Sequence, residues 1–363
     1  MYQAFACATA RRDAVSFREP VGGRLRPLIH SRLINPPFGD PGVYVAFLFE
    51  RRAMLFDLGD LAPLSDRTLL HVSHVLVTHT HMDHFTGFDR LVRIDLGRDK
   101  TLHLFGPPGF IERVAYRLAS YSWNLVQGYT TDLTLEIGEL HADGRAARAR
   151  LRCRNAFRVE PLPPGEARNG ILIDWPDCTV RATLLDHGIP CLGYAIEQRR
   201  HVNVWKNRVE DMGFRIGPWL AELKRAILRD DSDDQPFIVR WRDDDRRLHE
   251  ATHPLGLLRE RLTSIVPGQK IAYVTDAAWS EENRARIVSL ARDADLLYIE
   301  APFLDQDREL AARKLHLTAR QAGEVARAAG VKRVEPFHFS PRYSDGETTL
   351  RQEVEAGFAD LRA

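Results

Sequence analysis

The feature that most constrains this chain is a run of three histidines and one aspartate within six positions, His79-Thr80-His81-Met82-Asp83-His84. The run directly follows the apolar residues 75–77 and precedes a stretch, residues 85–93, that fits a short helix. A strand-to-helix turn of this composition directs several imidazoles and a carboxylate to one place. Because imidazoles and carboxylates are ligands of divalent metals, the sequence predicts a metal site, with a pair of ions as the favoured occupancy.

Bulk composition narrows the class of protein further. The chain has 363 residues, 44% of them hydrophobic, and a net charge of +1, so no overall field favours nucleic acid or membranes. Its four cysteines form no Cys-x-x-Cys pair, which argues against a disulfide framework. The first residues lack the apolar core of a signal peptide, and no apolar run approaches the ~20 residues of a membrane span. We therefore expect a cytoplasmic protein with no membrane partner.

The apolar pattern predicts two successive groups of strands with helices between them. Strands are expected at residues 43–49, 53–59, 72–77, 102–106, 133–137, 157–160, 170–173, 180–185, 270–276, 295–300 and 331–337. Helices are expected to begin after Pro107-Pro108-Gly109, near Ser280, at Thr318 through a capping box with Gln321, and near Glu347. This order predicts two sheets packed together with helices outside.

Three segments depart from this pattern. Residues 1–40 look irregular and are rich in Arg, Pro and Gly. The alternating arginines of residues 145–154 fit the solvated face of an edge strand, with a phosphate-contacting surface as the alternative. Residues 197–255 combine weak apolar spacing, a Gly217-Pro218 step and an acidic stretch at 230–234. We expect this segment to be an arm-like insertion in a single domain that spans residues 1–363.

Further candidate ligands lie at the ends of other predicted strands. His187 follows the strand at 180–185, Asp276 closes the strand at 270–276, and His338 follows the strand at 331–337. With the first run they make seven nitrogen and oxygen ligands and no thiolate, a set that suits two zinc ions with a water between them. A lone carboxylate such as Asp276 can touch both ions.

These motifs resemble those of the metallo-β-lactamase superfamily, whose α/β (α+β) fold is a four-layer αββα sandwich with metals in a cleft at one edge. Within it, three stretches resemble ribonuclease Z, the tRNA 3′-end endonuclease family: residues 186–194 around His187, residues 316–319 and residues 338–343. The resemblance spans roughly residues 43–345. It implies a zinc-dependent phosphodiesterase that processes the 3′ ends of precursor tRNA and works as a homodimer.

The resemblance also implies a role for each residue. His79, His81 and His187 would bind one zinc ion and Asp83, His84 and His338 the other, with Asp276 bridging them and manganese as a possible substitute. A metal-bridged hydroxide would attack phosphorus while Asp83 takes a proton. His316 would protonate the leaving oxygen, Glu300 would orient His316, and Arg342 would meet a substrate phosphate. Asp57, at a strand end, is expected either to brace a ligand histidine or to be a plain turn carboxylate.

The sequence leaves other functions open. The Gly-Thr-Gly stretch common near the start of ribonuclease Z is absent, and residues 230–234 are acidic, which favours a hydrolase of the same fold acting on a small or cyclic phosphodiester. An amide hydrolase fits less well because His316 and Arg342 suit a phosphate. A non-catalytic nucleic-acid-binding subunit is disfavoured because the ligand set is complete. In ribonuclease Z a flexible arm with a Gly-Pro element clamps the tRNA, and Gly217-Pro218 resembles that element.

Overall fold

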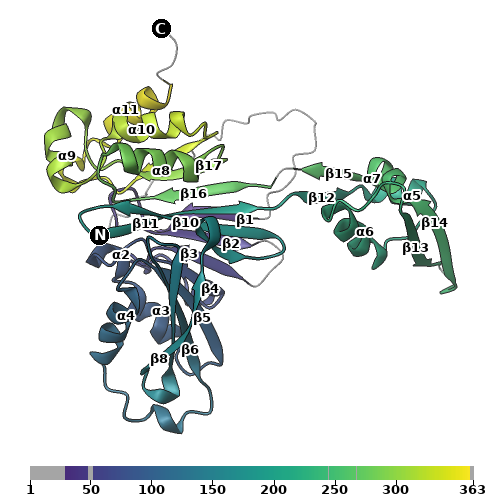
Figure 1. The fold of residues 1–363 in the computed structure, drawn as a ribbon, viewed down its shortest axis with the longest axis horizontal. Helices are drawn as coiled ribbons and strands as arrows, with labels where there is room; N and C mark the ends of the chain where they lie inside the picture. Colours follow the sequence, from purple (N-terminus) through teal and green to yellow (C-terminus); the bar gives the residue numbers. More distant parts are fainter. Residues whose placement is uncertain (1–28, 48–51, 244, 267, 360–363) are drawn as a thin grey trace, which may run out of the picture.

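The computed structural model describes residues 29–47, 52–243, 245–266 and 268–359. In this part of the chain two large sheets lie face to face, and helices cover the outer face of each (Figure 1). The layers are helix, sheet, sheet and helix, which confirms the predicted αββα sandwich. The expectations for residues 1–28 and for most of the turn before Ala53 fall outside the described residues.

The first sheet contains eight strands in sequence order. They are β1 (Ile29–Leu33), β2 (Val43–Phe47), β3 (Ala53–Phe56), β4 (Val72–Leu76), β5 (Lys100–Gly106), β6 (Leu133–Leu140), β7 (Arg145–Arg152) and β8 (Val159–Glu166). Strands β3 to β6 run parallel, and the remaining neighbours pair antiparallel. Residues 29–33 were expected to be irregular, but they form β1 because their backbone pairs with β2.

Four helices pack their apolar side chains against this sheet. They are α1 (Asp66–Leu69), α2 (Met82–Phe85), α3 (Phe88–Asp95) and α4 (Phe110–Ala119). The expected single helix after the histidine run is therefore two helices, α2 and α3, separated by Thr86 and Gly87. Gly87 leaves no room for a side chain, since an added Cβ would lie 2.3 Å from the Gly59 carbonyl oxygen. This close contact holds the histidine turn against the end of β3.

The second sheet contains six strands in the order β18-β17-β16-β11-β10-β9. They are β9 (Ile171–Asp174), β10 (Cys178–Asp186), β11 (Pro190–Gln198), β16 (Lys270–Val274), β17 (Leu296–Glu300) and β18 (Val334–Phe337). Strands β16, β17 and β18 run parallel, so their carboxyl ends lie at one edge of the sheet.

The helices of the second half are α8 (Glu281–Ala291), α9 (Arg308–Lys314), α10 (Ala319–Ala328) and α11 (Glu347–Ala359). Three predicted starts are confirmed: Ser280 caps α8, Thr318 with Gln321 forms the capping box of α10, and α11 begins at Glu347. Side chains of α8, α10 and α11 form one core with the outer face of the sheet. Among the described helices, none has the length and apolar character needed to cross a membrane.

A third core lies between the two sheets and holds them together. Phe56 of β3 stacks on Tyr194 of β11 and Tyr273 of β16, with ring centroids 5.9 and 5.4 Å apart. All three side chains are fully buried. The ends of β3, β11 and β16 are therefore fixed relative to one another, and one candidate ligand, Asp276, follows β16.

The arginine run of residues 145–154 does not lie on an edge strand, as we had expected. It forms β7, which pairs with β6 on one side and β8 on the other. Arg150 contacts Glu136 of β6 at 2.7 Å and Arg152 contacts Glu160 of β8 at 2.9 Å. Arg150 and Arg152 thus pair with acids on the neighbouring strands. This cross-strand pairing explains the arginine pattern better than a position on an edge strand does.

Residues 201–266 project from the sandwich, and we call them the arm (Figure 1). Its elements are β12 (His201–Val204), α5 (Lys206–Asp211), α6 (Trp219–Leu228), β13 (Pro236–Arg242), β14 (Leu248–Pro254), α7 (Leu255–Leu262) and β15 (Thr263–Val266). Strands β12 and β15 pair antiparallel at its base. The arm has a small core of its own around Trp219, Leu223 and Leu258. It extends beyond the expected end near residue 255 because α7 belongs to that core.

Candidate metal centre

The predicted ligands lie in loops at strand ends of both sheets. The turn after β4 and the start of α2 hold four of them, His79, His81, Asp83 and His84. His187 lies in the hairpin between β10 and β11. The others follow or end three parallel neighbours, β16 for Asp276, β17 for Glu300 and β18 for His338. Because carboxyl ends of parallel strands share an edge, the second sheet delivers its polar groups to one place.

Three site residues adopt a left-handed backbone conformation within two residues of the end of a strand. The φ angle is 56° at Asp57, 51° at Asp276 and 59° at His338. Aspartate and histidine adopt this conformation more readily than most residues with a side chain, at a cost of roughly 1–3 kcal/mol each. The surrounding packing must therefore hold these side chains in position, which is common at functional sites.

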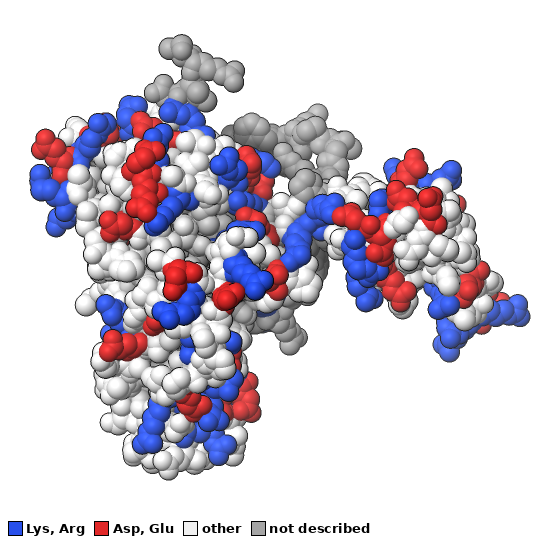
Figure 2. Space-filling view, in the orientation of Figure 1, with Lys and Arg blue, Asp and Glu red and all other residues white. Residues whose placement is uncertain are grey.

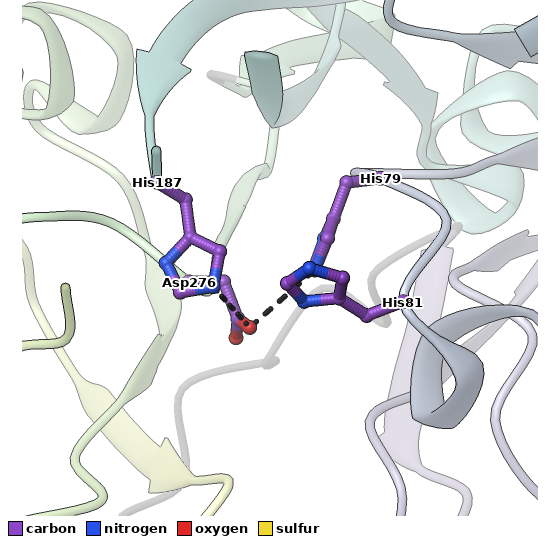
Figure 3. A group of neighbouring side chains, drawn as sticks. All are labelled: His79, His81, His187 and Asp276. Carbon is purple, nitrogen blue, oxygen red and sulfur yellow. Dashed lines mark ion pairs between the residues drawn. The ribbon is translucent and has the colours of Figure 1, made fainter. Parts of the chain in front are cut away.

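The first ligand group consists of His79, His81, His187 and Asp276. One ligand atom from each lies within 4.8 Å of all the others. Nε2 of His79 is 3.5 Å and Nε2 of His187 is 3.3 Å from Oδ2 of Asp276. Figure 3 shows these side chains reaching toward the same space from both halves of the sandwich.

The second ligand group consists of Asp83, His84 and His338, again within 4.8 Å of one another. Oδ2 of Asp83 is 3.5 Å from Nε2 of His84 and 3.2 Å from Nε2 of His338. Asp83 belongs to the first half of the chain and His338 to the second. The structure therefore completes this group with residues from both halves of the chain.

Asp276 connects the two groups. Its Oδ2 lies 3.5 Å from Nε2 of His84, and its Oδ1 lies 3.0 Å from Nδ1 of His338. The same Oδ2 is within 3.5 Å of Nε2 of His79 in the first group. The side chain is 3% exposed, so this carboxylate sits among imidazoles and not in solvent.

Hydrogen bonds fix the far nitrogen of three ligand histidines. Nδ1 of His84 donates to Asp57 at 2.9 Å, and Nδ1 of His187 donates to the Leu315 carbonyl at 2.8 Å. Nδ1 of His79 lies 3.1 Å from the Thr78 hydroxyl, which itself donates to Asp57. This network favours the tautomer that leaves the Nε2 lone pair free for a metal.

Two of these Nε2 atoms test whether the site fits a cation. Nε2 of His79 and of His84 are buried and have no hydrogen-bond partner among the described residues. Buried polar atoms are normally paired, so an orphaned pair pointing at one carboxylate is unusual. Burial, followed by the charge of His84, lowers the pKa of His79 to about 2, which keeps its imidazole neutral. A neutral imidazole beside a carboxylate, as His79 is beside Asp276, is a donor pair for a divalent metal ion.

Asp57 braces the histidine turn, which confirms one of its two expected roles. It is fully buried and accepts hydrogen bonds from the backbone N–H and hydroxyl of Thr78, at 2.7 and 2.9 Å, as well as from His84. The Tyr273 hydroxyl of the second sheet donates to it at 2.9 Å. No local pattern indicated the Tyr273 contact, because 216 residues separate the partners. The role of Thr78 could have been suspected from the sequence, because this residue immediately precedes the ligand His79.

His316 lies next to the ligand groups and is held by Glu300. Its Nδ1 is 2.7 Å from Oε2 of Glu300, and the other carboxylate oxygen accepts from the Ala277 backbone N–H at 2.9 Å. Glu300 is fully buried. Burial disfavours protonation of His316, but the Glu300 carboxylate outweighs it and raises the pKa of the imidazole. The structure thus brings together the predicted pair and places it beside His187 and His338.

Arg342, unlike the other predicted site residues, has no contact with the two ligand groups among the described interactions. It is exposed on the short helix η5 (Pro341–Tyr343), where its backbone N–H bonds Ser340. Pro341 lines a cavity with His316 and His338, whereas the residues that line this cavity do not include Arg342. A phosphate contact for Arg342 stays a prediction.

Comparison with known proteins places the fold. A family model described as a β-lactamase superfamily domain matches residues 33–205. Among solved structures, the metallo-β-lactamase fold protein YhfI from Bacillus subtilis superimposes with a TM-score of 0.51 and 14% identity, covering 91% of this chain and 93% of that one. This likeness concerns the fold alone.

Sequence relatives place the chain within that superfamily. Ribonuclease Z of Deinococcus radiodurans is 31% identical over 299 residues, which cover 81% of this chain and 84% of the relative. Ribonuclease Z of Thermobifida fusca is 31% identical over 277 residues, which cover 76% of this chain and 70% of the relative. The fold, the two ligand groups and these matches agree, and the chain belongs to the ribonuclease Z family of the β-lactamase superfamily.

Proposed function

We propose that this chain is a metal-dependent phosphodiesterase that cuts precursor tRNA at its 3′ end. The observation that carries the proposal is the meeting of two ligand groups at Asp276, with the His316–Glu300 pair beside them. Membership of the ribonuclease Z family supplies the substrate class. The active unit in this proposal is one metallo-β-lactamase domain, residues 1–363, that carries the arm.

The proposed cofactor is two zinc ions, with manganese as the alternative. His79, His81 and His187 would hold one ion, Asp83, His84 and His338 the other, and Asp276 would contact both. When bound, such a pair of ions generates a nucleophile from water near neutral pH and neutralises charge on the phosphate oxygens.

The chain's own residues handle the protons. Asp83, whose side chain is 43% exposed, is placed to take the proton that the attacking water loses. His316 gives a proton to the leaving oxygen from Nε2, because Glu300 already holds the hydrogen on Nδ1. Glu300 stabilises the charged imidazole before transfer and keeps the ring oriented afterwards. The raised pKa of His316 keeps more of it in the donating form near neutral pH.

The remaining roles concern RNA binding. Arg342 would contact a phosphate of the substrate from its exposed position beside the cavity. The arm would bind the body of the tRNA at a distance from the metal centre. We propose a cytoplasmic homodimer, in which the arm of one subunit would bind RNA held by the other subunit. These roles follow from membership of the ribonuclease Z family and from the projection of the arm in Figure 1.

A single sample tests the proposal. Purified protein is incubated with precursor tRNA, and its zinc and manganese content is measured on the same preparation. We expect about two metal ions per chain and accurate release of the 3′ extension. Intact precursor in the presence of fully metallated protein would contradict the tRNA part of the proposal.

One observation favours a second candidate, a hydrolase for small or cyclic phosphodiesters. Part of the basic charge on the arm is paired with acids, since Arg229 contacts Asp231, Arg240 contacts Glu250 and Arg259 contacts Asp233 at 2.7–2.9 Å. Figure 2 shows both signs of charge intermixed over the visible face of the arm. Salt separates the candidates, because RNA held through many phosphates is lost steeply as salt rises and a small diester is not.

A further inference from the structure

A cavity opens beside His316 on one side of the candidate metal centre. Its volume is about 270 Å³. Its walls come from three loops together with Asp83 of α2 and His316 before α10, and the lining residues are Phe38, Gly39, Asp40, Pro41, Asp83, Pro302, Phe303, His316, His338, Phe339, Ser340 and Pro341. Two of these loops follow β17 and β18, and the third, residues 38–41, precedes β2.

The cavity lies on the leaving-group side of the centre. It is lined by Asp83 and His338 of the second ligand group and by His316, whereas its lining does not include His79, His81 or His187. Because His316 is the proposed proton donor, the group that departs with the protonated oxygen must lie next to it. This argument rests on the proposed function.

The loop at residues 38–41 is held in place by contacts on both of its sides. The Phe339 N–H donates to the Pro37 carbonyl at 2.8 Å, and the rings of Phe38 and Phe339 meet edge to face at 5.3 Å. On the other side, a Cβ on Gly59 would lie 2.6 Å from Cβ of Asp40 and 2.8 Å from the Asp83 carbonyl oxygen. Asp40 is therefore held close to the backbone of a candidate metal ligand.

Asp40 differs in polarity from most of the residues that line the cavity. Apart from Asp83 and the two histidines, most of the lining is phenylalanine, proline or glycine. Oδ2 of Asp40 accepts from the Asp60 N–H at 3.1 Å, and Oδ1 makes no hydrogen bond among the described residues. An ionised carboxylate accepts hydrogen bonds and repels a phosphate, so it suits a neutral hydroxyl donor surrounded by apolar and ring surfaces.

We propose that Asp40 accepts a hydrogen bond from the ribose hydroxyl next to the leaving oxygen, which makes it a specificity-determining residue for RNA. A 2′-hydroxyl is adjacent to the 3′-oxygen of its own ribose, and it is the group by which a protein tells RNA from DNA. The bond that breaks is therefore between phosphorus and the 3′-oxygen, which takes the proton from His316. The 2′-hydroxyl keeps its proton throughout and stays bound to Asp40.

The test uses pairs of short oligonucleotides that differ in one group. One member is all-ribose, and the other carries a 2′-deoxyribose only at the nucleotide whose 3′-oxygen leaves. A hydrogen bond to a charged group is worth about 1.5–3 kcal/mol, so the native enzyme should favour the ribose member by roughly ten- to a hundredfold in kcat/KM. The products should carry 3′-hydroxyl and 5′-phosphate ends.

Two substitutions of Asp40 test its contact with the hydroxyl through the ratio of kcat/KM between the ribose and deoxyribose substrates. In Asp40→Ala the ribose substrate should lose most of its advantage, so the ratio approaches one. Asp40→Asn keeps an acceptor oxygen without the charge and should give an intermediate ratio. A ratio in Asp40→Ala equal to that of the native enzyme would overturn the inference, because general damage lowers both rates together.

Asp60→Asn is the matched control. Asp60 is an exposed neighbouring carboxylate whose Oδ1 accepts from the Ala62 N–H and which does not line the cavity. Its substitution removes the same charge near the site, and the native ratio should persist. A collapse of the ratio in Asp60→Asn as well would overturn the inference in favour of a general charge effect.

The oligonucleotides also separate this inference from the proposed function. Intact precursor tRNA, with oligonucleotides that are cleaved and show the hydroxyl preference, would refute tRNA processing and support the role of Asp40. Cleaved precursor tRNA without any preference between the paired oligonucleotides would support tRNA processing and overturn the role of Asp40.

Discussion

The sandwich and the arm are built in different ways. In the sandwich, charged groups such as Asp57 and Glu300 are fully buried, and each is held by several hydrogen bonds from different segments of the chain. In the arm, a small apolar core supports ion pairs that lie in solvent, such as Arg240 with Glu250, whose side chains are 60% and 49% exposed. Buried groups are costly to displace, whereas exposed ion pairs contribute little to stability.

The contrast indicates a division of labour. Hydrolysis needs several ligands fixed relative to one another, and the sandwich provides this through strand ends and a shared core. Recognition of a long substrate needs reach, and the arm provides this through its projection from the base strands β12 and β15 (Figure 1). Changes to the proposed metal ligands of the sandwich should therefore affect every phosphodiester, and changes in the arm should affect long RNA alone.

Asp276→Ala should have the largest effect, because it removes the carboxylate shared by both ligand groups. We expect hydrolysis of both RNA and an aryl diester to fall by roughly 10³-fold or more, equivalent to about 4 kcal/mol. Bound metal, measured on the same sample, should fall below that of the native protein. Asp66→Ala, at the exposed start of α1, is the control and should keep both activities. Normal turnover in Asp276→Ala would remove the two-metal mechanism.

His316→Ala should separate proton donation from the rest of the chemistry. Loss of a general acid should lower RNA cleavage by roughly 10²–10³-fold, because the leaving ribose oxygen needs a proton. An aryl diester with a nitrophenolate leaving group should lose far less, since that group departs without protonation. His30→Ala, on the exposed face of β1, is the control. Equal losses on the two substrates would argue that His316 is structural.

Removal of the arm should affect RNA and spare the small diester. Residues 201–266 can be replaced by a short Gly-Ser turn because His201 pairs with Val266 at the base of the arm. If the arm supplies several phosphate contacts, precursor-tRNA cleavage should fall by roughly ten- to a hundredfold, and its dependence on salt should flatten. Aryl diester hydrolysis measured on the same preparation is the control. Unchanged tRNA cleavage would show that the sandwich binds RNA by itself.

Glu300→Gln should give the smallest change, a shift of the pH profile. Glu300 raises the pKa of His316, so its neutralisation should lower that pKa. His316 donates when protonated, and activity on RNA is lost as pH rises through its pKa. The alkaline limb should therefore move to lower pH in Glu300→Gln. The aryl diester profile should keep its alkaline limb, and an unmoved limb for RNA would contradict the proposed pairing.

Local sequence signals located most of the side chains that the structure brings together. The His79–His84 run, and polar residues directly after apolar strands, identified side chains that the structure brings into two ligand groups. The capping box of Thr318 and Gln321 located α10. Such signals are reliable because strand alternation, capping and ligand chemistry depend on neighbours along the chain.

Predictions that depended on distant neighbours fared less well. Arginines on β7 resembled an edge strand, because the sequence does not show that β8 lies outside it. The arm was given too early an end, because Leu258 of α7 packs with Trp219 far back along the chain. Residues 29–33 looked irregular until β2 supplied their partner.

The sequence by itself determined the ligand types, their places at strand ends and the family resemblance. The tertiary structure alone decided that Asp276 lies between two groups from both halves, that Tyr273 holds Asp57, and that Asp40 faces the cavity beside His316. The physical reason is that these contacts join segments far apart along the chain, 216 residues in the case of Asp57 and Tyr273, or depend on left-handed conformations at Asp57 and Asp276. Local propensity does not specify such contacts, and the packing of the two sheets fixes them.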